Sequence, residues 1–166
     1  MCFFKSLKSE DVFKVFEQVA PNLKMKGYPY GNVQGENFKI SPYNSCKKES
    51  CVFGIKVQYG KWKMEFDYHY DNKAKEVRAR VWFYNLCLDG KNREVSRQLQ
   101  QSIKNQFKQF DFSFMPTATM VVSHTVKVKK AEQVTKFLSD FEYQWNNSGV
   151  LSYLTQFKTN EELGMK

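Results

Sequence analysis

The middle of the chain alternates apolar and polar residues almost without a break. From Gly54 to Asn85 it reads GIKVQYGKWKMEFDYHYDNKAKEVRARVWFYN. Such alternation is typical of strands with one face in a core and the other in water. The apolar positions form three sets, each of one parity: Phe53, Ile55, Val57 and Tyr59; Trp62, Met64, Phe66, Tyr68 and Tyr70; and Val77, Ala79, Val81 and Phe83. The pattern predicts three antiparallel strands joined by short turns.

Matching the apolar faces of these strands fixes the register of two hairpins. A two-residue turn at residues 60–61 places Tyr59 opposite Trp62, and a loop over residues 72–75 places Tyr70 opposite Val77. The polar residues that this register places opposite one another are Lys56 and Glu65, Asp67 and Arg80, and His69 and Arg78. Because a slip of one residue would move charges into the core, most of the charged face is explained as the mutually paired outer side of a meander.

Three other segments have the periodicity of amphipathic helices. The first begins at Ser6 or Ser9 and ends at Pro21, the second runs from Asn92 to Phe110, and the third runs from Ala131 to Asn146. Short strands are predicted over Glu36–Ser41 and Ala118–Val128, whereas DFSFMPT is interpreted as a connector. The segment VLSYLTQF is expected to add a short helix, and residues 158–166 to form a flexible tail.

The predicted element order is α-β-β-β-β-α-β-α. This order indicates one α+β domain over residues 1–166, in which a four-stranded antiparallel meander and a fifth strand form one sheet with three helices packed on it. The 166 residues carry a formal net charge of +9, which favours an anionic partner such as nucleic acid or an acidic protein surface. No apolar run is long enough for a membrane span, and the start MCFFKSLKSEDV lacks the pattern of a signal peptide, so we expect a soluble, cytoplasmic protein without a membrane partner.

The cysteines and histidines do not predict a metal site or a cofactor. Cys46 and Cys51 flank the loop CKKESC without forming a C-x-x-C pair, and reduced thiols are expected there, a disulfide being the alternative for a secreted protein. His124 lies on the predicted apolar face, where a buried neutral imidazole is expected, and His69 lies on the polar face.

The order α-β-β-β-α-β, taken without the strand at Glu36, is similar to the core of the restriction-endonuclease-like nucleases. That resemblance implies a metal site built from Asp67 or Asp71 with Glu76 of the motif EVR. In this motif Arg78 stands where the family has lysine, and no other catalytic motif is present. A divergent metal-dependent nuclease is therefore an alternative, and no residue is predicted to be catalytic or to bind metal.

The strongest functional signal is a basic ridge on the second helix, formed by Arg93, Arg97, Lys104 and Lys108 opposite its apolar stripe. These cations could follow an anionic backbone, although a solvated helix face explains them as well. A second group, Arg78, Arg80 and Trp82 with Tyr84 beside them, lies on the polar sheet face unless another layer covers it. The sequence thus predicts a non-catalytic basic binding module for nucleic acid or an acidic protein, with a protein–protein adaptor of incidental charge as a further alternative.

Overall fold

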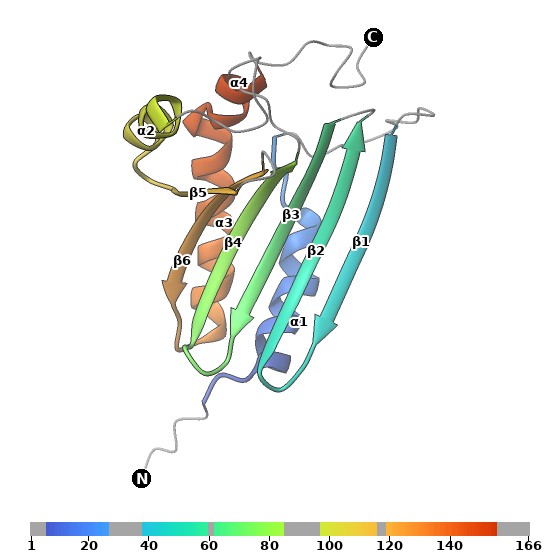
Figure 1. Ribbon diagram of the computed structural model, residues 1–166. Helices are drawn as coiled ribbons and strands as arrows, with labels where there is room; N and C mark the ends of the chain where they lie inside the picture. Colours follow the sequence, from blue (N-terminus) through green and yellow to red (C-terminus); the bar gives the residue numbers. More distant parts are fainter. Residues whose placement is uncertain (1–5, 27–37, 60–61, 85–96, 116–118, 156–166) are drawn as a thin grey trace.

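The structure is a computed structural model that describes residues 6–26, 38–59, 62–84, 97–115 and 119–155. Figure 1 shows its strands side by side in one sheet with helices behind them. The strands are β1 (Phe38–Cys46), β2 (Ser50–Tyr59), β3 (Trp62–Asp71), β4 (Glu76–Tyr84), β5 (Asp111–Met115) and β6 (Thr119–Lys127). The helices are α1 (Ser9–Val19), the short 3-10 helix η1 (Ala20–Asn22), α2 (Arg97–Gln106), α3 (Ala131–Ser148) and α4 (Val150–Thr155).

The sheet has six strands in the order β1-β2-β3-β4-β6-β5, and each neighbouring pair is antiparallel. The predicted α+β class and the meander of β1 to β4 are confirmed. The strand count is different, because the segment interpreted as a connector contains β5, an edge strand paired with β6. The first strand also extends to Cys46 rather than ending at Ser41.

The predicted register of both hairpins is confirmed. Tyr59 is opposite Trp62, and Tyr70 is opposite Val77. The polar pairs also occur as predicted: Lys56 with Glu65, Asp67 with Arg80, and His69 with Arg78. The alternation of apolar residues therefore sets which side chains face the core and which face away from it.

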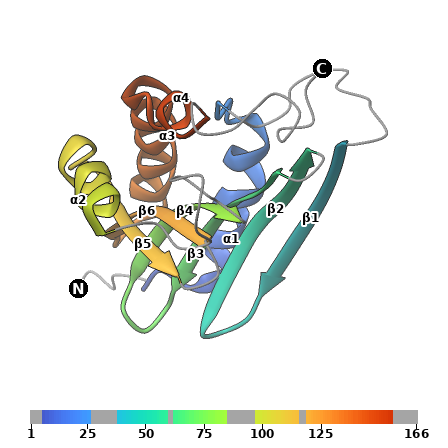
Figure 2. The same cartoon turned by 45° about the horizontal axis from the view of Figure 1, so that its top comes forward.

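One face of the sheet packs against α1 and α3, which lie behind the strands in Figure 1 and beside each other in Figure 2. The rings of Phe16 from α1 and Tyr68 from β3 are 6.2 Å apart, and those of Trp145 from α3 and Phe83 from β4 are 6.1 Å apart. His124 stacks on Phe137 of α3 at 5.8 Å and is half-buried, so its predicted side is confirmed. This helical layer encloses the core and leaves the opposite sheet face for other contacts.

The first and third helices end close to their predicted limits. Pro21 lies in η1, directly after α1, and Gly149 ends α3 with a left-handed φ of 78°. The second helix ends at Gln106, earlier than the predicted Phe110, and residues 92–96 of the prediction lie outside the described residues. Ile103 and Phe107 are buried on the apolar side of this segment, and the Phe107 ring lies 6.3 Å from that of Phe112 in β5.

Candidate functional site on the open face of the sheet

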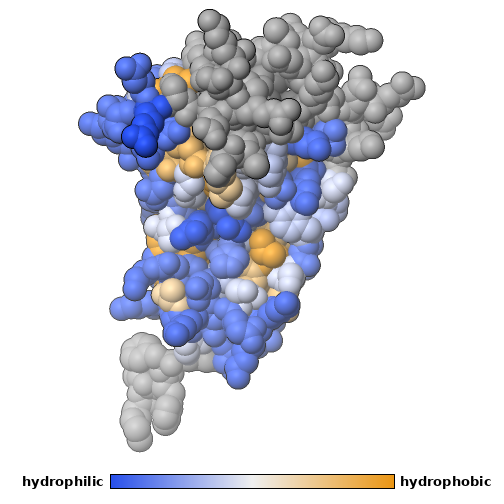
Figure 3. All heavy atoms as spheres, viewed as in Figure 1, coloured by the Kyte–Doolittle hydropathy of each residue, from blue (hydrophilic) through white to orange (hydrophobic). Residues whose placement is uncertain are grey.

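The open face, as we call the sheet face turned away from α1 and α3, carries a cluster of polar and aromatic side chains. Of the described helices, α1 and α3 cover the other face, so the expected alternative of a helical layer over Trp82 and Tyr84 is wrong. Figure 3 views this face directly and shows hydrophilic residues with a few isolated hydrophobic ones. The cluster consists of Tyr43, Glu65, Asp67, Arg80, Trp82 and Tyr84 and is called the polar network below.

Asp67 is the centre of the polar network. Its residue is only 3% exposed, and its carboxylate accepts hydrogen bonds from the Arg80 Nε at 2.6 Å and the Trp82 Nε1 at 3.1 Å. The Tyr43 hydroxyl lies 3.0 Å from the same carboxylate. A buried carboxylate needs such partners, because it loses most of its hydration on folding. Asp67 therefore fixes the positions of side chains from β1 and β4.

Glu65 is the second carboxylate of the network. The Tyr84 hydroxyl donates to it at 2.8 Å, the Tyr43 hydroxyl lies 3.0 Å from its other oxygen, and the Lys56 Nζ is 3.7 Å away. Because the Tyr43 hydroxyl carries one proton, it donates to Glu65 or to Asp67 at any moment. Tyr43 therefore joins the two carboxylates into one hydrogen-bonded group.

Gly54 makes room for Tyr43. The two residues are direct partners between β1 and β2, and a Cβ placed on Gly54 would lie 2.2 Å from the Tyr43 Cζ. Glycine in a strand interior weakens the strand unless another group needs the space, as the tyrosine ring does here. The ring thus crosses β2 to reach the carboxylates on β3.

We expect Gly54→Ala to lower the free energy of unfolding by about 2–3 kcal/mol, because the displaced ring would lose hydrogen bonds to charged groups. Urea denaturation would measure the change. In a Tyr43→Ala background the same substitution should be nearly neutral, since no ring remains to be displaced. An equal cost in both backgrounds would contradict this account.

The network also holds an aromatic pair. The rings of Trp82 and Tyr84 are 6.3 Å apart and nearly parallel, at 7°, and the Arg80 guanidinium lies 5.2 Å from the Trp82 ring centroid. Arg80, predicted to contact a ligand, is thus engaged with Asp67 and Trp82 inside the protein. The Arg80 guanidinium is placed to hold Trp82 in position. The rings of Trp82 and Tyr84 remain partly exposed.

Burial in the network raises the pKa of both tyrosines well above their usual value. Desolvation is the largest cause for each, followed for Tyr43 by the charges of Asp67 and Glu65 and for Tyr84 by the hydrogen bond to Glu65. The neutral hydroxyl is therefore the stable form in the folded protein.

We expect the protein to lose stability as pH rises above about 10, since the unfolded chain then releases these two protons while the folded chain keeps them. A tyrosinate absorbance titration of the folded protein, compared with the variant Tyr43→Phe/Tyr84→Phe, would measure this. The two titrations should agree near pH 10 and differ only on alkaline unfolding. A smaller amplitude near pH 10 in the variant would contradict the prediction.

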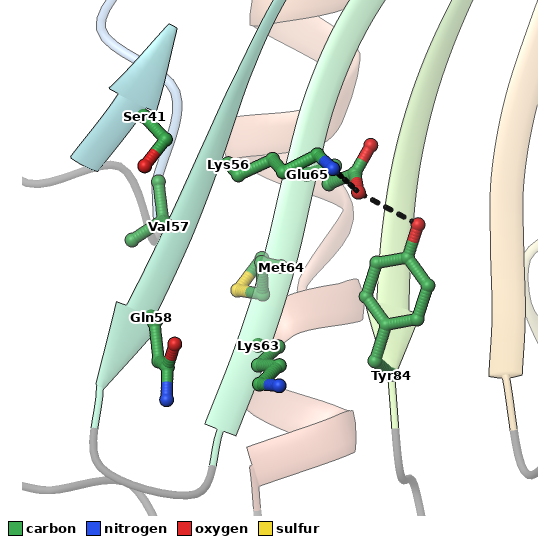
Figure 4. Close-up of a pocket in the computed structure, with 8 residues that line it drawn as sticks. All are labelled: Ser41, Lys56, Val57, Gln58, Lys63, Met64, Glu65 and Tyr84. Atoms are coloured by element: carbon green, nitrogen blue, oxygen red, sulfur yellow. Dashed lines mark hydrogen bonds and ion pairs between the residues drawn. The ribbon is translucent and has the colours of Figure 1, made fainter. Parts of the chain in front are cut away.

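A shallow hollow of about 390 Å³ lies beside the network at the end of the β2–β3 hairpin. Figure 4 shows Lys56, Glu65 and Tyr84 in line on its wall and Lys63 nearby. Its other lining residues are Ser41, Val57, Gln58 and Met64. The Lys56 side chain is 62% exposed and that of Glu65 only 13%, so the cation reaches solvent while the carboxylate stays inside the network.

Arg78 and His69 lie at the other side of the network. Arg78 is exposed, and its Nε donates to the Thr125 Oγ1 at 2.9 Å. Burial, with the nearby charge of Arg80, lowers the pKa of His69, so this half-buried imidazole is neutral at neutral pH. Arg78 therefore supplies a cation to the open face and His69 does not.

The predicted basic ridge lies apart from this cluster. Arg97 and Lys104 are exposed on α2, Lys108 is exposed just after its end, and Arg93 lies outside the described residues. The Lys104 Nζ is 5.8 Å from the Phe114 ring centroid, which directs it along β5. The predicted site residues thus form two groups, one on β4 and one on α2 beside β5, and β6 lies between β4 and β5 in the sheet.

The carboxylates of the nuclease alternative have other contacts. Asp67 is enclosed by the network, and Asp71 accepts hydrogen bonds from the backbone N–H groups of Lys73 and Ala74 in the β3–β4 turn. Glu76 lies opposite Asp71 in the sheet. Among the described residues no group of three or more His, Cys, Asp or Glu side chains could hold a metal ion.

Sequence reasoning missed Tyr43, because the first strand was ended before it, and treated Glu65 only as the partner of Lys56. A polar residue opposite a glycine in a neighbouring strand is a signal that could have identified Tyr43. The chain matches no protein-family model, no curated protein and no solved structure. Within the described part of the chain, no helix has the length and apolar character needed to cross a membrane.

Proposed function

We propose that the protein is a non-catalytic basic module that binds single-stranded nucleic acid on the open face of its sheet. One observation carries this proposal: the carboxylates of Glu65 and Asp67 are bound inside the network, while Lys63 and Arg78 at its rim are exposed. Lys63 and Arg78 therefore present positive charge at the rim, although the half-buried Asp71 and Glu76 lie on the same face beside Arg78. Asp111 on β5 is an exposed carboxylate on the same face and marks one limit of this basic area.

The shape and chemistry of the face favour a single strand over a duplex. A sheet face presents side chains over a wide area, which suits unpaired bases, whereas duplex grooves admit a helix or a narrow ribbon. Trp82 and Tyr84 offer partly exposed rings for base stacking, and the surrounding cations can contact phosphates. An acidic protein would use the cations but would gain less from the stacked rings.

Binding should weaken when a rim cation is neutralised. We expect Arg78→Gln to lower the affinity for a fluorescent single strand about fivefold at 0.1 M salt, because one phosphate contact contributes a slope of about −0.7 in log affinity against log salt. Fluorescence anisotropy over a salt series would measure affinity and slope together. The control is Lys14→Gln, which removes an exposed cation from α1 on the covered side.

An equal loss of affinity in Arg78→Gln and Lys14→Gln would contradict the proposal. The absence of saturable binding to single strands would contradict it as well. Tighter binding to an acidic protein than to single strands would assign the face to the other partner class. The same samples incubated with Mg²⁺ test the nuclease alternative, since metal-dependent cleavage that is lost in Glu76→Ala would show catalysis.

A further inference from the structure

The turn between β1 and β2 carries two cysteines that face each other. Cys46 and Cys51 are direct partners, and the backbone N–H of Lys47 donates to the Ser50 carbonyl at 2.8 Å to close the turn. Hydrogen-bonded and non-hydrogen-bonded pairs alternate along an antiparallel ladder. The cysteines therefore form a non-hydrogen-bonded pair, the type in which side chains come closest.

This position suits a covalent bond between the two sulfur atoms. Cα atoms of such pairs are about 4.5 Å apart, which lies within the range of about 4.4–6.8 Å that a disulfide spans. Both side chains lie on the sheet face that carries α1, and each thiol is near enough to affect the pKa of the other. Cys51 is 1% exposed, whereas Cys46 is exposed.

Cys46 opens into a hollow of about 520 Å³ at the lower end of the sheet in Figure 1. The turns β1–β2 and β3–β4 and the start of α1 form its wall, which contains Lys8, Lys47, Lys48 and Lys75 together with Glu10. The Lys75 Nζ donates to the Leu7 carbonyl and to the Asn72 Oδ1, both at 2.8 Å, and so holds the wall together. The other three lysines are exposed and give the hollow an excess of positive charge.

We propose that Cys46 and Cys51 form a thiol–disulfide site whose oxidant is an anionic low-molecular-weight disulfide held by the lysines of the hollow. The Cys46 thiol gives its proton to solvent, and its sulfur attacks one sulfur of the oxidant. The oxidant's S–S bond breaks, and the leaving thiolate takes up a proton. Cys51 then loses its proton and attacks the Cys46 sulfur, which releases the second thiol. Two electrons and two protons pass from the protein to the oxidant.

The surroundings of the two thiols assign their order of reaction. Burial raises the pKa of Cys51 to about 12 and shields it, so it cannot be the first to react. Burial also raises the pKa of Cys46, with Glu10 and Glu17 adding to the rise, which slows its reaction with dilute disulfides. The lysines counter this by concentrating an anionic oxidant beside the exposed sulfur.

The test uses the full chain with Cys2→Ser and Cys87→Ser, so that Cys46 and Cys51 are its only two thiols. Both replaced residues lie outside the described part of the structure. Glutathione disulfide and the neutral bis(2-hydroxyethyl) disulfide are compared at equal concentration and about pH 8, with intact mass and free thiols followed over time. Both reagents should give a product lighter by two hydrogens and reversed by dithiothreitol. The anionic reagent should react about three to ten times faster.

Three variants separate the parts of the proposal. Lys47→Gln/Lys48→Gln should remove the preference for the anionic reagent and still form the disulfide, whereas the matched change Lys14→Gln/Lys136→Gln on α1 and α3 should keep the preference. Cys51→Ala should stop at a stable adduct on Cys46. A lasting adduct on Cys46 in the protein that keeps Cys51 would overturn the proposal. Equal reaction rates for the two reagents in the protein that keeps all its lysines would overturn it too.

Discussion

Replacing Asp67 with alanine is expected to lower the free energy of unfolding by about 3–5 kcal/mol, the usual cost of removing one partner from a buried charge pair. Arg80 is only 22% exposed in its side chain and would remain without its carboxylate. The Trp82 Nε1–H would lose its acceptor, and the Tyr43 hydroxyl would lose one of its two acceptors.

Denaturation by urea, or a fall in melting temperature of about 10 °C, would measure the loss. Asp111→Ala is the matched control, because it removes an exposed carboxylate from the neighbouring part of the same face and should change stability by at most about 0.5 kcal/mol. Asp67→Asn keeps the shape and removes the charge. It should still cost about 2 kcal/mol, because its amide N–H₂ would face groups that are themselves donors.

A double-mutant cycle with Arg80→Ala isolates the ion pair. Once Asp67 is replaced, the loss of Arg80 should cost much less than it does in the unchanged protein, with a coupling of about 1.5 kcal/mol or more. Additive costs would show that the two residues act independently. That result would contradict the view that Asp67 organises the open face.

The strands and their register could be predicted because a period of two leaves few alternatives when one face is buried. A slip of one residue would have placed Asp67 in the helical layer and Phe66 on the open face, and both would be costly. The helices were predictable for the same reason, since Phe16 and Ile103 belong to apolar stripes at helical spacing.

The parts that could not be predicted depend on contacts between distant segments. The strand β5 has five residues with Phe112 and Phe114 as its alternating apolar members, too short a pattern to separate from a loop. Tyr43 acquires its role only because Gly54 lies opposite it and two carboxylates lie beyond. Its strand contains Pro42 and few apolar residues, so the local pattern gives little indication that it continues.

The sequence predicted only some members of the polar network, since it missed Tyr43 and treated Glu65 only as the partner of Lys56. Parity alone placed Trp82, Arg78 and Arg80 on one face, which the structure confirms. It could not distinguish Arg80, whose side chain is taken up by Asp67, from the exposed Arg78, because this distinction depends on burial. Nor could periodicity establish how far the ridge on α2 lies from that face.

Neutralising Arg97 and Lys104 of the basic ridge is expected to lower the affinity for nucleic acid, which is the second large effect. From Arg97 to Phe110 the chain has three cations and no acidic residue, and five glutamines can add hydrogen bonds to an anionic strand. If each of the two cations neutralises one phosphate, Arg97→Gln/Lys104→Gln should flatten the slope of log affinity against log salt by about 1.4 units for single strands. The affinity at 0.1 M salt should then fall about 25-fold.

The matched control is Lys14→Gln/Lys136→Gln, which lowers the net charge equally on the helical layer. Anisotropy titrations of both variants over the same salt series would separate a local contact from a general effect of charge. Thermal unfolding of the ridge variant should change little, although the contact between Lys104 and the Phe114 ring contributes about 0.5–1 kcal/mol at most. Equal slopes for the two variants would assign Arg97 and Lys104 to an ordinary solvated helix face and leave the open face as the only proposed binding surface.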